Sequence, residues 1–182
     1  MEKTLRRTII KLSKETAFIL LTVVSAVVLP QTFHGIGLLL GVGGMLGQIF
    51  LPMYIPVLIL GFYRGPVSGA IVGLLAPIVS FAVTGMPAKA ILPYIVLELI
   101  ATGALAGVFS KAKLPAVFRV LSVQVIAKII RLAAFAIALY IASGAVSPTV
   151  LFSGILASIP CVIIQLCLVT YLIAKKDKKL GE

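Results

Sequence analysis

Long apolar stretches constrain the fold of this chain more than any other feature. Of its 182 residues, 61% are hydrophobic and only 12% are charged, and the mean hydropathy is +1.22. A helix that crosses a bilayer core of about 30 Å needs roughly 20 mostly apolar residues. A soluble globule of this size has no room to bury so many. The sequence therefore indicates an integral membrane protein and excludes secreted disulfide scaffolds, nucleic-acid binders and disordered tails.

The apolar stretches predict an all-α bundle of six transmembrane helices, in a single domain that covers residues 1–182. The second span is too short to cross alone, and Pro52 and Pro56 lie at its start. We therefore expect it to begin within the membrane or to be extended by the segment before it. The expected spans are 16–33, 53–64, 66–83, 90–109, 118–142 and 150–173.

A glycine-rich segment, residues 35–50, separates the first two spans. Its glycines disfavour a helix, yet it is apolar enough to stay near protein or lipid. Irregular backbone at membrane depth is tolerated only where protein or a wet cavity satisfies its polar groups. We interpret the segment as an outer loop that forms a lid over the bundle, with an ordinary extracellular loop as the alternative.

The basic residues predict the orientation. The net charge of +11 comes from 16 Lys and Arg against five Asp and Glu, and the cations cluster at the ends of apolar segments. This placement fits orientation in a bilayer rather than a surface that binds nucleic acid. With the N-terminal segment 1–15 inside, an even number of crossings returns the tail 174–182 to the cytoplasm. Lys89 alone then lies in an outer loop, and the cytoplasmic cations are Lys3, Arg6, Arg7, Lys11, Lys14, Arg64, Lys111, Lys113, Arg119, Lys175, Lys176, Lys178 and Lys179.

Small residues spaced four apart predict close helix packing. They occur as Gly69 and Gly73 in the third span and as Gly103 and Gly107 in the fourth. Small residues at this spacing let two helices approach closely within a membrane, and we expect these two pairs to make contacts within the chain. A shorter seam in the first span, Thr22 with Ala26, is able to receive a partner helix or to pack internally.

Three charged side chains lie inside predicted spans: Glu98, Lys128 and Arg131. Because charge within a bilayer is costly, we expect all three to face the bundle interior. Each belongs to a polar helix face, and we expect three such faces to share one cavity. The faces are Tyr94, Glu98 and Thr102; Gln124, Lys128 and Arg131; and Ser158, Cys161 and Gln165.

One anion against two cations leaves the expected cavity with a surplus positive charge, which favours an anionic or carboxylate-bearing ligand. Alternatively, Lys128 extends towards the cytoplasmic surface and leaves a structural pair of Glu98 and Arg131.

No catalytic pattern is present, so we expect neither an enzyme nor a bound cofactor or metal. His34 is the only histidine and Asp177 the only aspartate. Cys161 and Cys167 are six residues apart on a helix, face different directions, and are not expected to form a disulfide. The chain lacks a phosphate-binding P-loop sequence, so energy from ATP has to come from another subunit.

The second quarter of the chain carries a pattern that resembles a known family. It consists of residues 48–57 (Gln-Ile-Phe-Leu-Pro-Met-Tyr-Ile-Pro-Val), 61–66 (Gly-Phe-Tyr-Arg-Gly-Pro), Gly69 with Gly73, and 84–87 (Thr-Gly-Met-Pro). This pattern resembles the S components of energy-coupling factor (ECF) transporters, the small membrane subunits that capture vitamins for ABC-type importers in prokaryotes. Tyr54 stands where many relatives have histidine.

The resemblance implies a multi-pass protein of the prokaryotic cell membrane, with a solute site in its outer half and a lid between the first two spans. It also implies docking to a transmembrane coupling subunit that two ATPase subunits energise. In such proteins small residues of the first helix contact that subunit, here at Thr22 and Ala26. The residues expected to bind the solute are Gln48, Tyr54, Lys89, Tyr94, Glu98, Lys128, Arg131 and Gln165.

Among the vitamins, pantothenate fits the surplus positive charge best. Folate, pyridoxine, hydroxymethylpyrimidine and α-ribazole remain open. Two other classes are alternatives: a membrane scaffold without a solute, in which the buried ions only fix helix register, and an autonomous small secondary transporter.

Overall fold

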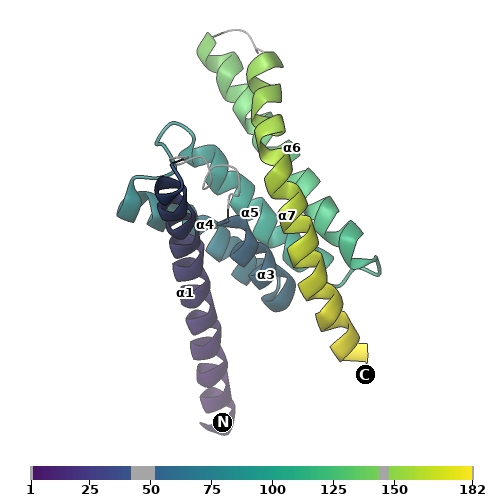
Figure 1. The fold of residues 1–182 in the computed structure, drawn as a ribbon. Coiled ribbons are helices and arrows are strands. Elements are labelled where there is room, and N and C mark those ends of the chain that lie inside the picture. The colour runs from purple at the N-terminus through teal and green to yellow at the C-terminus, as the bar shows by residue number, and fades with distance from the viewer. Residues whose placement is uncertain (1, 42–51, 144–147, 182) are drawn as a thin grey trace.

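The computed structural model describes residues 2–41, 52–143 and 148–181, and in these ranges it contains six helices and no strand (Figure 1). Five helices are long and apolar enough to cross a membrane, which confirms the predicted all-α class and supports a membrane protein. α3 is shorter, with 11 residues. The helices are α1 (Glu2–Leu39), α3 (Tyr54–Arg64), α4 (Pro66–Thr84), α5 (Leu92–Phe109), α6 (Ala116–Ser143) and α7 (Pro148–Gly181).

α1 is longer than the sequence predicted. It passes through Pro30 and ends at Leu39, so residues 35–39, which we expected to begin the lid, are helical. A helix satisfies its own backbone hydrogen bonds, and in apolar surroundings this outweighs the helix cost of about 1 kcal/mol for each glycine. The part of the predicted lid from residue 42 to residue 50 lies outside the described residues.

α7 also extends past its expected end, because residues 174–181 of the predicted tail continue the helix. Lys176 and Asp177 hold this last part against the bundle. The Lys176 ammonium donates a hydrogen bond of 2.8 Å to the carbonyl of Phe62 in α3, and Arg119 of α6 forms an ion pair with Asp177. These charged groups order a basic segment that sequence alone assigns to solvent.

The short helix α3 forms the centre of the core. Most of its side chains are buried, and it contributes to both hydrophobic clusters of the structure. In the first cluster it packs against α1, α4 and α5, and in the second against α5, α6 and α7. α3 is therefore covered by other helices, and its first residue, Tyr54, is placed inside the bundle.

α4 and α5 approach each other through glycines. A Cβ added at Gly69 would overlap the carbonyl of Gly103, and one added at Gly73 would overlap the carbonyl of Leu99. At the other end of this seam a Cβ at Gly107 would overlap the backbone of Pro66. The predicted role of both glycine pairs in contacts within the chain is confirmed.

A single residue, Gly65, connects α3 to α4. Its φ of 99° lies in the region that favours glycine, and its N–H donates to the carbonyl of Gly61 at 2.9 Å. Pro66 then begins α4, where a missing backbone N–H costs nothing. The two helices therefore turn sharply and stay in contact.

The helices form a central block with flanking elements (Figure 1). α5 contacts α3, α4 and α6. Within the described residues α1 packs only on α3 and α4, whereas α7 packs on α6 and α3. α1 and the pair of α6 and α7 thus lie on opposite sides of the block, and the two chain ends lie at the same end of the bundle.

Replacing Gly103 with alanine tests the glycine seam. We expect the variant to lose about 2 kcal/mol of stability, because the added methyl group has to push the α4 backbone away. Thermal unfolding in detergent, followed by circular dichroism, measures the change. Gly35→Ala is the matched control, because a Cβ there meets nothing within 4 Å, and it should leave stability unchanged or raised. Equal losses in both variants would contradict the packing described.

Candidate functional site

A buried carboxylate lies at the centre of the candidate site. Glu98 of α5 is only 1% exposed and accepts hydrogen bonds from three side chains. The Tyr54 hydroxyl donates to Oε2 at 2.6 Å, and the Arg131 guanidinium donates to the same oxygen at 2.9 Å. The Lys128 ammonium donates to Oε1 at 3.3 Å. We call these four residues the ionic cluster.

Three helices position the ionic cluster. Tyr54 is the first residue of α3, which the surrounding core holds in place. Glu98 lies on the buried face of α5 together with Thr102, whose hydroxyl donates to the Glu98 carbonyl at 2.7 Å. Lys128 and Arg131 lie one turn apart near the middle of α6, in the candidate span Ala116–Ile141. The cluster therefore joins α3, α5 and α6 within helices that are apolar enough to cross a membrane, where charge is costly.

The cluster contains two cations and one anion. The predicted gathering of Glu98, Lys128 and Arg131 is confirmed, and Lys128 reaches Glu98 instead of extending to the cytoplasmic surface. The Lys128 and Arg131 side chains are 23% and 30% exposed, so the cations are more accessible than the carboxylate they share. Because Glu98 carries one charge, the cluster keeps a surplus positive charge when all three groups are ionised. The cavity expected around these groups stays a prediction.

Further predicted residues surround the ionic cluster. Tyr94 of α5 contacts Phe135 of α6 edge-on, with ring centroids 5.1 Å apart, and so adds an aromatic contact between the two helices. Gln165 of α7 is buried and donates to the Cys161 sulfur at 2.6 Å. Gln165 and Cys161 thus form a buried polar pair on α7.

Two other predicted binding residues are not part of the cluster. Lys89 lies in the connection between α4 and α5 and is exposed. Gln48 lies outside the described residues. Their proposed contact with a solute stays a prediction.

The predicted docking residues lie on α1. Ala26 is fully buried in the core cluster that α1 shares with α3, α4 and α5. Thr22 is half-buried, and its hydroxyl donates to the Phe18 carbonyl of the same helix at 2.7 Å. Within this chain, Ala26 therefore packs internally, while part of Thr22 stays accessible.

Some contacts of the structure were not anticipated from the sequence. At the end of the bundle that holds the chain termini, Arg64 pairs with Glu15 at 2.9 Å and lies over the Phe18 ring at 3.8 Å. The ion pair of Arg119 and Asp177 joins α6 to α7 at the same end. Opposite charges at the ends of neighbouring spans are the signal that would have indicated both pairs.

The two cations of the ionic cluster are groups that can donate hydrogen bonds to an anion. Lysine and arginine supply donors in different directions, and arginine matches the planar geometry of a carboxylate. Among the described residues no three His, Cys, Asp or Glu side chains lie close enough to hold a metal ion.

No family model matches the chain, and neither a curated protein nor a solved structure matches it significantly. A function therefore has to be inferred from the geometry of the ionic cluster.

Replacing Glu98 with glutamine tests the energetic role of the carboxylate. We expect a loss of about 3 kcal/mol in stability, because two partly buried cations lose their common counter-charge. Thermal unfolding of the purified protein measures it.

Glu15→Gln is the matched control, since it removes the carboxylate of a more exposed ion pair with Arg64. We expect it to cost less than about 1 kcal/mol. A Glu98→Gln variant as stable as the control variant would show that the ionic cluster contributes nothing to the fold.

Proposed function

We propose that this chain is the solute-capturing membrane subunit of an importer, of the kind that the S components of ECF transporters represent. The observation that carries the proposal is the ionic cluster, in which one buried carboxylate is shared by two more accessible cations on α6. A small anionic solute would complete its charge balance.

The imbalance of charge supports a binding role. A structural ion pair within a membrane needs one cation for one anion, and every further charge adds a desolvation penalty. Retaining both Lys128 and Arg131 beside Glu98 is therefore costly unless another anion joins them. A solute carboxylate supplies that anion and takes charge-assisted hydrogen bonds from both side chains.

This chemistry favours a small water-soluble vitamin that carries a carboxylate. Pantothenate is the preferred candidate, because it combines one carboxylate with polar, uncharged groups. Folate also carries carboxylates, whereas pyridoxine, hydroxymethylpyrimidine and α-ribazole would have to use the cluster through neutral hydrogen bonds. Tyr94 would pack against the body of the solute, and Gln48, Lys89 and Gln165 would complete its surroundings.

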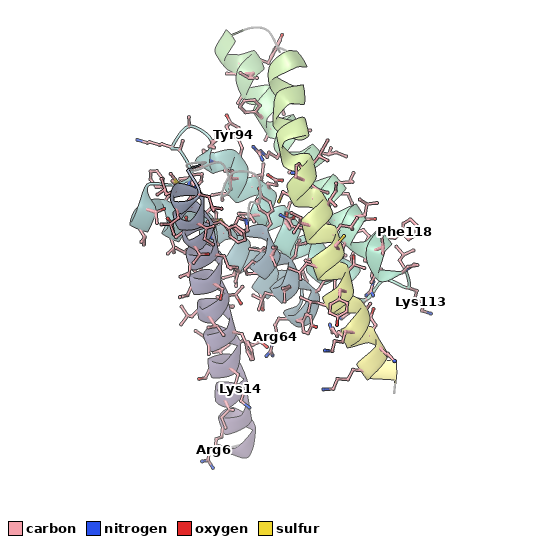
Figure 2. The ribbon with its side chains drawn as sticks, viewed as in Figure 1. Arg6, Lys14, Arg64, Tyr94, Lys113 and Phe118 are labelled. Carbon is pink, nitrogen blue, oxygen red and sulfur yellow. The ribbon has the colours of Figure 1, made fainter. Side chains whose placement is uncertain are left out.

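The distribution of charge supports a topology with both termini in the cytoplasm. Figure 2 shows Arg6, Lys14 and Arg64 towards the end of the bundle that holds the chain termini, and Tyr94 towards the opposite end. Basic residues concentrate on the cytoplasmic side of membrane proteins. In this orientation six crossings, with α3 as the short one, open the solute site towards the outside of the cell membrane.

Uptake driven by ATP would require partners: a transmembrane coupling subunit and two ATPase subunits. We propose that α1 docks to the coupling subunit near Thr22, where a small side chain allows close approach. Ala26 is covered by the chain's own core and would join that contact only if α1 shifted relative to α3 and α4.

A membrane scaffold without a solute is the second candidate. This candidate is supported by the burial of Glu98 among three donors from α3 and α6. Bonds of this kind would also fix the positions of these helices relative to α5 without any solute. Solute binding separates the two candidates.

Mass spectrometry of the protein purified in mild detergent tests the proposal. We expect a retained anionic solute, and we expect Arg131→Gln to weaken its binding by roughly 2 kcal/mol, about thirtyfold, through loss of a charge-assisted hydrogen bond. Titration of the identified solute into the emptied protein measures the affinity.

Arg64→Gln is the matched control, because it removes a guanidinium that pairs with Glu15 and does not belong to the ionic cluster. Its solute affinity should equal that of the unchanged protein. A folded preparation that retains and binds no solute would favour the scaffold.

The docking face on α1 is tested by Thr22→Leu. The larger side chain should reduce copurification with the coupling subunit and leave solute affinity unchanged, since the Thr22 hydroxyl bonds within α1 and does not belong to the ionic cluster. Quantified pull-down of coexpressed subunits measures this, with Val24→Leu on an exposed position of the same helix as the control. Normal complex yield in both variants would reject this face.

A further inference from the structure

Gln124 of α6 is a buried amide for which the described residues supply no hydrogen-bond partner. Its side chain is only 5% exposed, and neither its oxygen nor its nitrogen has a partner within the described part of the chain. Buried side-chain amides are nearly always paired, because an unpaired polar group in apolar surroundings costs about as much as a lost hydrogen bond. An orphaned amide therefore indicates a partner that joins in another state of the protein.

The position of Gln124 relates it to the ionic cluster. It lies one helical turn, about 6 Å along the axis, from Lys128, and two turns, about 10 Å, from Arg131, on the same face of α6. On α5, Thr102 follows Glu98 by one turn, and on α7, Gln165 follows Cys161 by one turn. All three polar side chains are at least 95% buried, and Gln124 and Thr102 each lie one turn from a residue of the cluster, on the side that faces the cytoplasm in the proposed orientation.

The chemistry of an amide defines what this partner has to offer. Gln124 presents two N–H donors and one carbonyl acceptor. A neutral group that both donates and accepts, such as a hydroxyl or an amide, matches this set, whereas a carboxylate or an aliphatic group does not.

We propose that Gln124 binds the uncharged polar end of the solute whose anionic end lies at Lys128 and Arg131. The inference rests on the proposed function and narrows the solute class to a carboxylate joined to a hydroxyl- or amide-bearing chain. The spacing of Gln124 and Arg131 along α6 sets the distance between the two ends. Because neighbours cover Gln124 here, contact with the solute also requires α6 to move relative to α5 or α7.

Two probes of matching charge test the proposal by calorimetry on the full chain in nanodiscs. Pantothenate carries a carboxylate, an amide and hydroxyls, whereas heptanoate carries the carboxylate alone. We expect Gln124→Met, which keeps the volume and removes the hydrogen bonds, to weaken pantothenate by about tenfold or more and to leave heptanoate unchanged. Arg131→Gln should weaken both probes.

A second readout follows from the unpaired amide. The ligand-free Gln124→Met protein should unfold at a higher temperature than the unchanged chain, because an unpaired buried amide has been removed. Gln124→Leu serves the same purpose if the methionine variant does not fold. Ile129→Met on the exposed face of α6 is the control and should change neither probe's affinity.

Three outcomes would overturn the inference. Unchanged pantothenate affinity in Gln124→Met would show that the amide binds no solute, and the proposed function would stand. A lower unfolding temperature would show that the amide has a partner in the empty protein, such as a buried water. If the unchanged chain bound neither probe, the solute class would be wrong, and mass spectrometry of the retained solute would judge the proposed function separately.

Discussion

The balance of charge around Glu98 is the constraint on which the interior of this protein depends. A carboxylate that is 1% exposed within a membrane-spanning helix is stable only if donors surround it, and Tyr54, Lys128 and Arg131 supply them from two other helices. The same bonds fix how α6 lies on α5 and where α3 begins. A requirement of electrostatics thereby determines the relative positions of three helices, and it leaves a positive surplus that an anionic solute would offset.

The short helix α3 fills the interior between the longer helices. Helices in lipid gain little from apolar contact alone, so close approach and filled interiors have to hold the bundle together. α3 fills the interior with apolar side chains such as Val57, Leu58 and Phe62, which contribute to both core clusters. Glycines on α4 and α5 then let the remaining helices approach each other closely. Because α3 has only 11 residues, it begins in the interior, where its first residue, Tyr54, donates to Glu98.

Much of the fold and the centre of the site followed from periodicity and the cost of burying charge. These rules predicted both ends of α3, α4, α5 and α6, and the start of α7, to within about two residues. They also predicted the convergence of Glu98, Lys128 and Arg131. They did not predict the bond from Tyr54, because no local rule places the start of α3 against α5. The C-terminal ends predicted for α1 and α7 were wrong, because both helices continue further. The prediction used the free-energy cost that glycine and lysine have in a helix exposed to water. Gln124 was recognised as part of a polar stripe, but whether a buried amide has a partner depends on three-dimensional packing.

The one-residue connection at Gly65 has a mechanical consequence. A connection of one residue keeps α3 in contact with α4. The close approach of the backbones at Gly69 and Gly103 keeps α5 packed against both. Tyr54 and Glu98 thus belong to helices that the glycines hold together, whereas Lys128 and Arg131 belong to α6 and reach Glu98 through their side chains. An anion that competed with Glu98 for the two cations would therefore weaken the contact between α6 and these three helices.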